Sequence, residues 1–155
     1  MRAILINPFD RVVSEIDLVP GLAAKYAALS GPGFPVGDEE GNFPTDPIKW
    51  EGLDREPMPV RLIDVVSLGE PHDLVIDDEG RFADNQACFG LRCGPDLIAG
   101  RALLVQCDDQ GDTVATTVPI DAVRAAVVWL PWDTDYTPSG PTFISFSDDV
   151  VRKFL

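Results

Sequence analysis

The chain has 155 residues, and its 45% hydrophobic and 25% charged side chains are ordinary usage for a globular domain. Charge is its extreme feature, because 26 acidic against 12 basic residues give a formal net charge of −14. This excess disfavours direct binding to nucleic acid, which requires lysine and arginine to displace counterions from phosphates. We therefore expect a basic or nucleic-acid-binding protein as the partner. Acidity that only keeps the domain in solution stays an open alternative.

Length and hydropathy bound the class of protein. A chain of this size forms one domain by default, here residues 1–155. No apolar run approaches the roughly 20 residues of a membrane span, and Pro8 interrupts the N-terminal apolar run too early for a secretory signal. We expect a cytoplasmic protein without membrane contact. Cys88, Cys93 and Cys107 are odd in number, which favours free and mostly buried thiols over disulfides.

The first predicted elements are a hairpin and a helix. Residues 2–7 and 12–18 are rich in aliphatic side chains and are separated by a turn at 8–11. Pro20 suits a first helical turn, and apolar residues then recur at helical spacing until Gly31. Residues 31–59 are rich in proline, glycine and acidic side chains, which predicts an insertion into the domain.

The rest of the chain predicts strands joined mostly by hairpins. A short helical turn is expected at 119–121, and a short C-terminal helix is expected to start after Ser147, which is a good N-cap. Hairpin signals outnumber strand-helix-strand units, so we predict an α+β fold with a mainly antiparallel sheet. The predicted strands cover residues 60–68, 74–76, 87–92, 102–107, 113–118, 125–130 and 142–146.

Two acidic turns resemble each other, and both are candidate contacts with a partner or ligand. One holds Asp77, Asp78 and Glu79, and the other holds Asp108 and Asp109. Clustered carboxylates suit hard cations, but neither turn has the spaced oxygen donors of a calcium loop. Ordinary hairpin turns explain both sequences, and we predict no metal.

Catalytic and cofactor motifs are not recognisable. The cysteine spacing lacks the close ligand pairs of a zinc site, and cysteines on apolar strands are usually core residues. His72 lies between Pro71 and Asp73 in a predicted turn, so we expect a solvated loop residue. No glycine-rich phosphate motif is present. We predict neither an enzyme nor a bound cofactor.

Aromatic residues follow the predicted strand 125–130. Trp129 and Trp132 precede several acidic residues, and they serve either as aromatics that cap the core or as anchors for a partner. A rival hypothesis is a small-molecule binder for a nucleotide-like ligand, within one chain or between the copies of a homo-oligomer. Its sign would be arginines converging on a pocket beside one of these tryptophans, and the candidates are Arg61, Arg92 and Arg101.

Strand and turn signatures occur in residues 2–8, 74–80, 84–86, Phe89, 98–105 and 108–111. With these segments, about half of the chain resembles a family of small phage and prophage proteins of unknown function. The resemblance implies a small accessory protein that acts inside a bacterial cell, and it transfers no catalytic residue. Our leading hypothesis is therefore a non-enzymatic, phage-type accessory protein that binds a host protein through an acidic surface. In a sharper version of this hypothesis, the acidic surface imitates nucleic acid and inhibits a host defence or DNA-handling protein.

Overall fold

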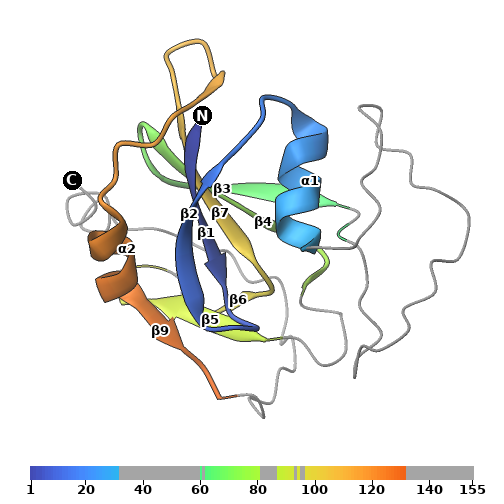
Figure 1. The fold of residues 1–155 in the computed structure, drawn as a ribbon, viewed down its shortest axis with the longest axis vertical. Helices are drawn as coiled ribbons and strands as arrows, with labels where there is room; N and C mark the ends of the chain where they lie inside the picture. The colour runs from blue at the N-terminus through green and yellow to red at the C-terminus, as the bar shows by residue number, and fades with distance from the viewer. Residues whose placement is uncertain (32–59, 61, 81–86, 93, 95–96, 132–155) are drawn as a thin grey trace, which may run out of the picture.

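The computed structural model describes residues 1–31, 60, 62–80, 87–92, 94 and 97–131. These residues form a large sheet, a small sheet and two short helices (Figure 1). Every strand pairing between the described strands is antiparallel. The predicted α+β class with a mainly antiparallel sheet is thus confirmed.

The large sheet has the spatial order β2-β1-β7-β4-β3, and the short strand β8 pairs with the far end of β7. Consecutive strands in the sequence form the hairpins β1–β2, β3–β4 and β7–β8, as local turn sequences predict. The strands are β1 (Arg2–Asn7), β2 (Val12–Asp17), β3 (Ile63–Gly69), β4 (His72–Asp77), β7 (Ala102–Cys107) and β8 (Thr113–Val114).

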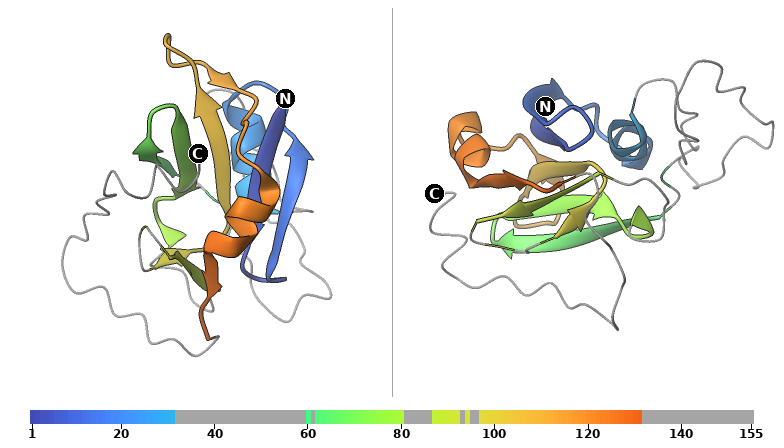
Figure 2. Two further views of the ribbon diagram at one scale, coloured as in Figure 1. Left: turned by 90° about the vertical axis from the view of Figure 1, so that its left-hand side faces the viewer. Right: turned by 90° about the horizontal axis from the view of Figure 1, so that it is seen from below.

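The small sheet has the order β6-β5-β9 and consists of β5 (Cys88–Leu91), β6 (Ile98–Ala99) and β9 (Val127–Trp129). Helix α2 (Ile120–Ala126) leads directly into β9. Helix α1 (Leu22–Ser30) follows the first hairpin, as predicted. The two helices flank the β1–β2 hairpin on opposite sides (Figures 1 and 2).

Each face of the large sheet has its own core because side chains alternate along a strand. Leu103 and Val105 of β7 pack with Tyr26 and Leu29 of α1. Leu104 belongs to the opposite core, which the small sheet and α2 complete.

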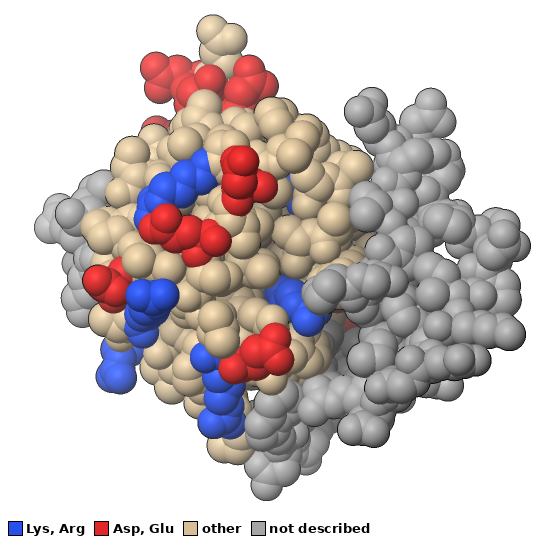
Figure 3. Space-filling model, in the orientation of Figure 1, with Lys and Arg blue, Asp and Glu red and all other residues tan. Residues whose placement is uncertain are grey.

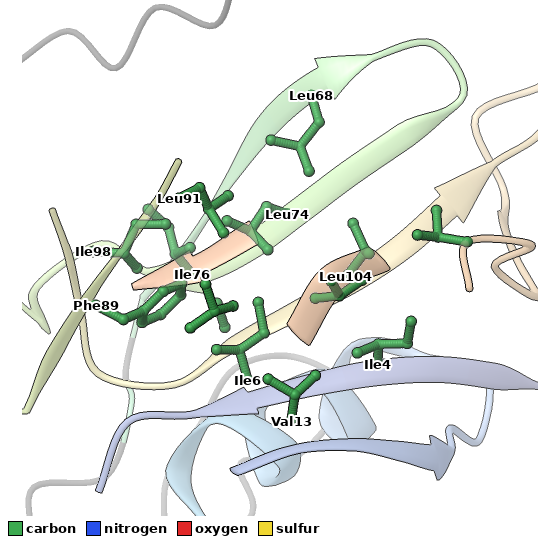
Figure 4. Close-up of a cluster of buried hydrophobic side chains, with 14 residues drawn as sticks. Ile4, Ile6, Val13, Leu68, Leu74, Ile76, Phe89, Leu91, Ile98 and Leu104 are labelled. Carbon is green, nitrogen blue, oxygen red and sulfur yellow. The ribbon is translucent and has the colours of Figure 1, made fainter. Parts of the chain in front are cut away.

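The second core brings the two sheets together. In Figure 4, Phe89, Leu91 and Ile98 of the small sheet point toward Leu74 and Ile76 of β4. Phe89 has no exposed surface, so it is fully removed from water. Burial of such side chains contributes on the order of 2 kcal/mol each to folding.

Several predicted strands differ from the structure in length, and for two of them the contacts show a cause. The strand expected at 113–118 is confined to β8, because residues 116–118 bind the side chain of Arg2 and do not continue the pairing with β7. The guanidinium Nη1 of Arg2 donates to the carbonyl oxygens of Thr116 and Val118 at 2.7 and 2.8 Å. The strand expected at 125–130 begins two residues later, because α2 extends through Ala126.

Several expectations fall outside the described residues. These are the insertion at 31–59, the strand at 142–146 and the C-terminal helix after Ser147. The second helix that the structure describes is α2, where the short helical turn after Pro119 is expected.

Candidate binding surface

The two predicted acidic turns lie at opposite ends of β4. Asp77 ends β4, and Asp78 and Glu79 continue into the following turn. The turn with Asp108 and Asp109 instead joins β7 to β8 and lies beside the start of β4, where His72 pairs with Gln106. A strand of this length separates the turns by roughly 17 Å. The structure therefore does not bring these predicted contact residues into one site.

The β7–β8 turn is held by a single carboxylate. Asp108 Oδ1 accepts hydrogen bonds from the backbone N–H groups of Gln110 and Asp112, both at 2.9 Å. Gly111 adopts φ +87°, which favours glycine. Asp108, Asp109 and Asp112 are all exposed, and Figure 3 shows acidic side chains at the projecting tip of the molecule.

The β3–β4 turn lies beside this hairpin, as Figures 1 and 2 show. The backbone N–H of Cys107 donates to the carbonyl oxygen of Pro71 at 2.8 Å. The Cys107 thiol donates to Asp73 Oδ2 at 3.0 Å. Five carboxylates thus gather at one end of the large sheet, and we name this group the acidic end: Glu70, Asp73, Asp108, Asp109 and Asp112.

The acidic end forms no ion pair with any described residue. Lys25 lies nearby, but its Nζ donates to Thr113 Oγ1 at 2.8 Å. The other described cations are also engaged within the domain, each by at least one hydrogen bond: Arg2, Arg11, Arg92, Arg101 and Arg124. No lysine or arginine in the described part of the chain therefore balances the negative charge of the acidic end.

Cys107 is a poor nucleophile at neutral pH. Burial, together with the hydrogen bond to Asp73 and the negative charge there, raises its pKa to about 11. Burial also raises the pKa of Cys88, so both thiols stay protonated. Both are free; Cys88 is buried as expected and Cys107 only partly, whereas Cys93 lies outside the described residues.

His72 is not a solvated loop residue, and that expectation was wrong. It begins β4, and only 1% of its surface is exposed. The turn is tighter than the sequence suggests, because Gly69 and His72 already pair with each other. The alternation of β4 then turns the imidazole to the same side of the sheet as Leu74. Neither ring nitrogen has a hydrogen-bond partner among the described residues.

Asp77 has an unusual environment at the other end of β4. Burial raises its pKa to about 6, and the nearby charges of Glu79 and Asp78 add to the effect. The backbone N–H of Glu79 donates to Asp77 Oδ1 at 3.0 Å and partly opposes the shift. Composition alone gives no sign of this perturbation, because it depends on how the turn packs.

Trp129 belongs to the core of the small sheet. Its ring meets Phe89 edge to face, with centroids 6.3 Å apart, and it is only partly exposed. This arrangement favours a core-capping role over that of a partner anchor. Trp132, its companion candidate, lies outside the described residues.

The arginines of the rival hypothesis do not converge. Arg92 Nε donates to the carbonyl oxygen of Ala125 near the end of α2. Arg101 instead donates to the carbonyl oxygen of Ser30 at the end of α1, and it lies 4.7 Å from the centroid of the Phe9 ring. Arg61 lies outside the described residues.

Among the described residues, no group of three or more histidine, cysteine, aspartate or glutamate side chains could hold a metal ion. No described helix has the length and apolar character to cross a bilayer. Comparison with protein-family models, curated proteins and solved structures finds no match to this chain.

Proposed function

We propose that this chain is a non-enzymatic binding protein whose acidic end contacts a basic protein. The observation that carries the proposal is the set of carboxylates at the acidic end, none of which pairs with a described lysine or arginine. Unpaired charge of one sign attracts a partner of the opposite sign and accelerates encounter.

The shape of the surface supports the same proposal. Asp109 and Asp112 lie on a projecting hairpin, and their side chains make no hydrogen bond with described residues. They can meet the lysine or arginine side chains of a partner without breaking a side-chain hydrogen bond to the described residues. Asp108 holds the turn and so presents its two neighbours in a fixed geometry.

The resemblance to phage and prophage proteins suggests where such a partner would be found. A host protein that handles DNA, or a host defence protein, carries a basic surface for phosphates. Carboxylates displayed on a rigid hairpin can occupy such a surface in place of nucleic acid. The expected mode of action is therefore competitive inhibition of a host protein, inside the bacterial cell.

The test is capture from a bacterial lysate with the tagged chain at about 0.05 M and about 0.5 M salt, followed by mass spectrometry. The key variant is Asp109→Asn with Asp112→Asn. The matched control is Asp78→Asn with Glu79→Gln, which removes the same charge from the other end of β4. We expect a basic protein that wild type and control retain, that the key variant loses, and that high salt releases.

Two results would contradict the proposal. Equal loss of capture by both variants would mean that total charge matters and that the acidic end does not. Capture that resists high salt would exclude a mainly electrostatic contact. The rival small-molecule hypothesis has no supporting observation among the described residues, since Arg92 and Arg101 are engaged at separate places.

A further inference from the structure

The buried imidazole of His72 is the least explained polar group in the described part of the chain. It is 1% exposed, and both ring nitrogens lack a partner. Leaving a buried polar group unpaired costs about 1–3 kcal/mol. Such a group calls for a physical reason, because most buried polar atoms in proteins are paired.

The surroundings of His72 are almost free of charge. Its strand neighbours are Gly69 on β3 and Gln106 on β7, and neither ionises. Gln106 Oε1 is itself engaged by Thr117. The core on this face of the sheet is apolar.

The titratable groups nearby lie on other faces or in the turns. Asp73 follows on the opposite face of β4, Glu70 lies in the turn, and Cys107 and Asp108 end β7. Among the elements that complete the core, Asp121 and Arg124 of α2 are exposed and pair with each other. Burial lowers the pKa of His72, and the charge of Asp73 only partly opposes this.

His72 also occupies a position that couples the core to the acidic end. Its neighbours in sequence are Pro71 and Asp73, and both form hydrogen bonds with Cys107. A displacement of the backbone at His72 would therefore strain both contacts. The β3–β4 turn would then separate from the β7–β8 hairpin.

We propose that protonation of His72 expels the imidazole from the core and releases the β3–β4 turn, which makes the acidic end a pH-sensitive structure. The part of this inference that concerns partner binding rests on the proposed function. The conformational switch does not, because it can be tested on the isolated chain. A neutral imidazole tolerates the apolar site, whereas an imidazolium without a counterion does not.

The linkage has a defined sign. The closed state holds His72 neutral, whereas the open state exposes it at its ordinary pKa of about 6.5. The stabilisation of the closed state by neutral His72 is therefore fully present above that pH. As pH falls below it, the opening constant rises by up to tenfold per unit.

The experiment uses the only histidine of the chain as its own reporter. NMR of the imidazole from about pH 7.5 to 5 follows protonation, and hydrogen exchange of the Cys107 amide follows opening. After correction for intrinsic exchange, we expect protection of this amide to fall by up to tenfold per pH unit below about 6.5. The Leu18 amide, bonded to the Met1 carbonyl, serves as the reference and should change less.

The variant His72→Leu should keep the Cys107 amide protected over the same range, and His72→Gln provides a second neutral side chain if the first folds poorly. Asp77 also titrates near pH 6, at the far end of β4. Asp77→Asn should leave the pH dependence at Cys107 unchanged. If wild type and both His72 variants lose protection equally, or if the imidazole titrates without loss of protection, the inference is wrong.

The link to binding is read separately. Lysate capture at about pH 5.5 and 7.5 should show loss at the lower pH for wild type and retention by His72→Leu. If no basic protein is captured at either pH, the proposed function fails, while the exchange result still decides the switch. Equal loss of capture by both proteins would mean that the switch does not regulate binding.

Discussion

Two charged regions of the molecule differ in whether their acidic side chains form ion pairs with described residues. Around the β1–β2 hairpin and α2, acids meet bases: the N-terminal amine pairs with Asp17, Arg2 with Glu15, and Arg124 with Asp121. We name these three pairs the paired region. The acidic end has comparable exposure but no ion pair among the described residues.

The difference separates charges that help to hold the fold from charges that are available to a partner. In the paired region, Arg2 also binds two backbone carbonyl oxygens and fastens the chain after β8 to β1. At the acidic end, only the side chains of Asp108 and Asp73 form hydrogen bonds with other described residues. Removing charge should therefore affect folding in the first region and mainly binding in the second.

The largest effect is expected for Arg2→Ala. This change leaves the carbonyl oxygens of Thr116 and Val118 without their charged donor. We expect the free energy of unfolding to fall by about 2–3 kcal/mol, measured by urea denaturation at pH 7. Arg124→Ala is the control, because its ion pair is exposed, and it should cost less than about 1 kcal/mol. Arg124 also donates to the carbonyl oxygen of Val13, but only at 3.3 Å. Equal losses would mean that the two shorter bonds of Arg2 to backbone carbonyl oxygens add nothing to stability.

An effect of intermediate size is expected for Asp77→Asn, which should raise the free energy of unfolding at neutral pH. The pKa of Asp77 is raised from 3.8 to about 6, so the folded state prefers the neutral carboxyl. Its contribution to stability is full below the unfolded value of 3.8 and is lost as pH rises through about 6.

Asparagine cannot ionise and can still accept the N–H of Glu79. The variant should therefore be more stable than wild type above pH 6 by about 1 kcal/mol, with the difference vanishing near pH 4. Urea denaturation of both proteins at several pH values across this range measures the difference in free energy of unfolding. A constant difference at all pH values would show that the carboxylate charge is not the cause.

The smallest effect concerns Asp108 and separates its structural contact from its charge. Asp108→Ala removes the acceptor for two exposed turn N–H groups and should lower stability by about 0.5 kcal/mol. Asp108→Asn keeps an oxygen acceptor and should cost less than half of that. Thermal unfolding of the two variants measures the difference. If both lose equally, the charge of Asp108 and not its acceptor oxygen holds the turn.

Local sequence predicted much of this fold. The turn at 8–11, the end of α1 at Gly31 and the acidic β7–β8 turn all depend on residues close in the chain, and the structure places hairpins and a helix there. The short strand β6 was not predicted, because two residues carry no detectable periodicity.

The candidate surface was predicted only in part. Asp108 and Asp109 were recognised as acidic turn residues, and Asp112 lies in the same turn. Glu70 and Asp73 join them only through the pairing of β4 with β7. Asp77, Asp78 and Glu79 looked equivalent in sequence, but the antiparallel register places them at the other end of the strand. The conformation of a turn depends on residues close in sequence, whereas neighbours on adjacent strands can be far apart in sequence.

By itself, the sequence determined the excess of acidic charge, the hairpins and the first helix, because composition and short-range turn preferences need no distant contact. Only the tertiary structure decided which described charges are paired, that Trp129 packs against Phe89, and that His72 is buried beside Gln106. Burial and long-range hydrogen bonding depend on residues more than thirty positions apart, as with Arg2 and Thr116 or His72 and Gln106. Such neighbours exist only once the strands have found their order in the sheet.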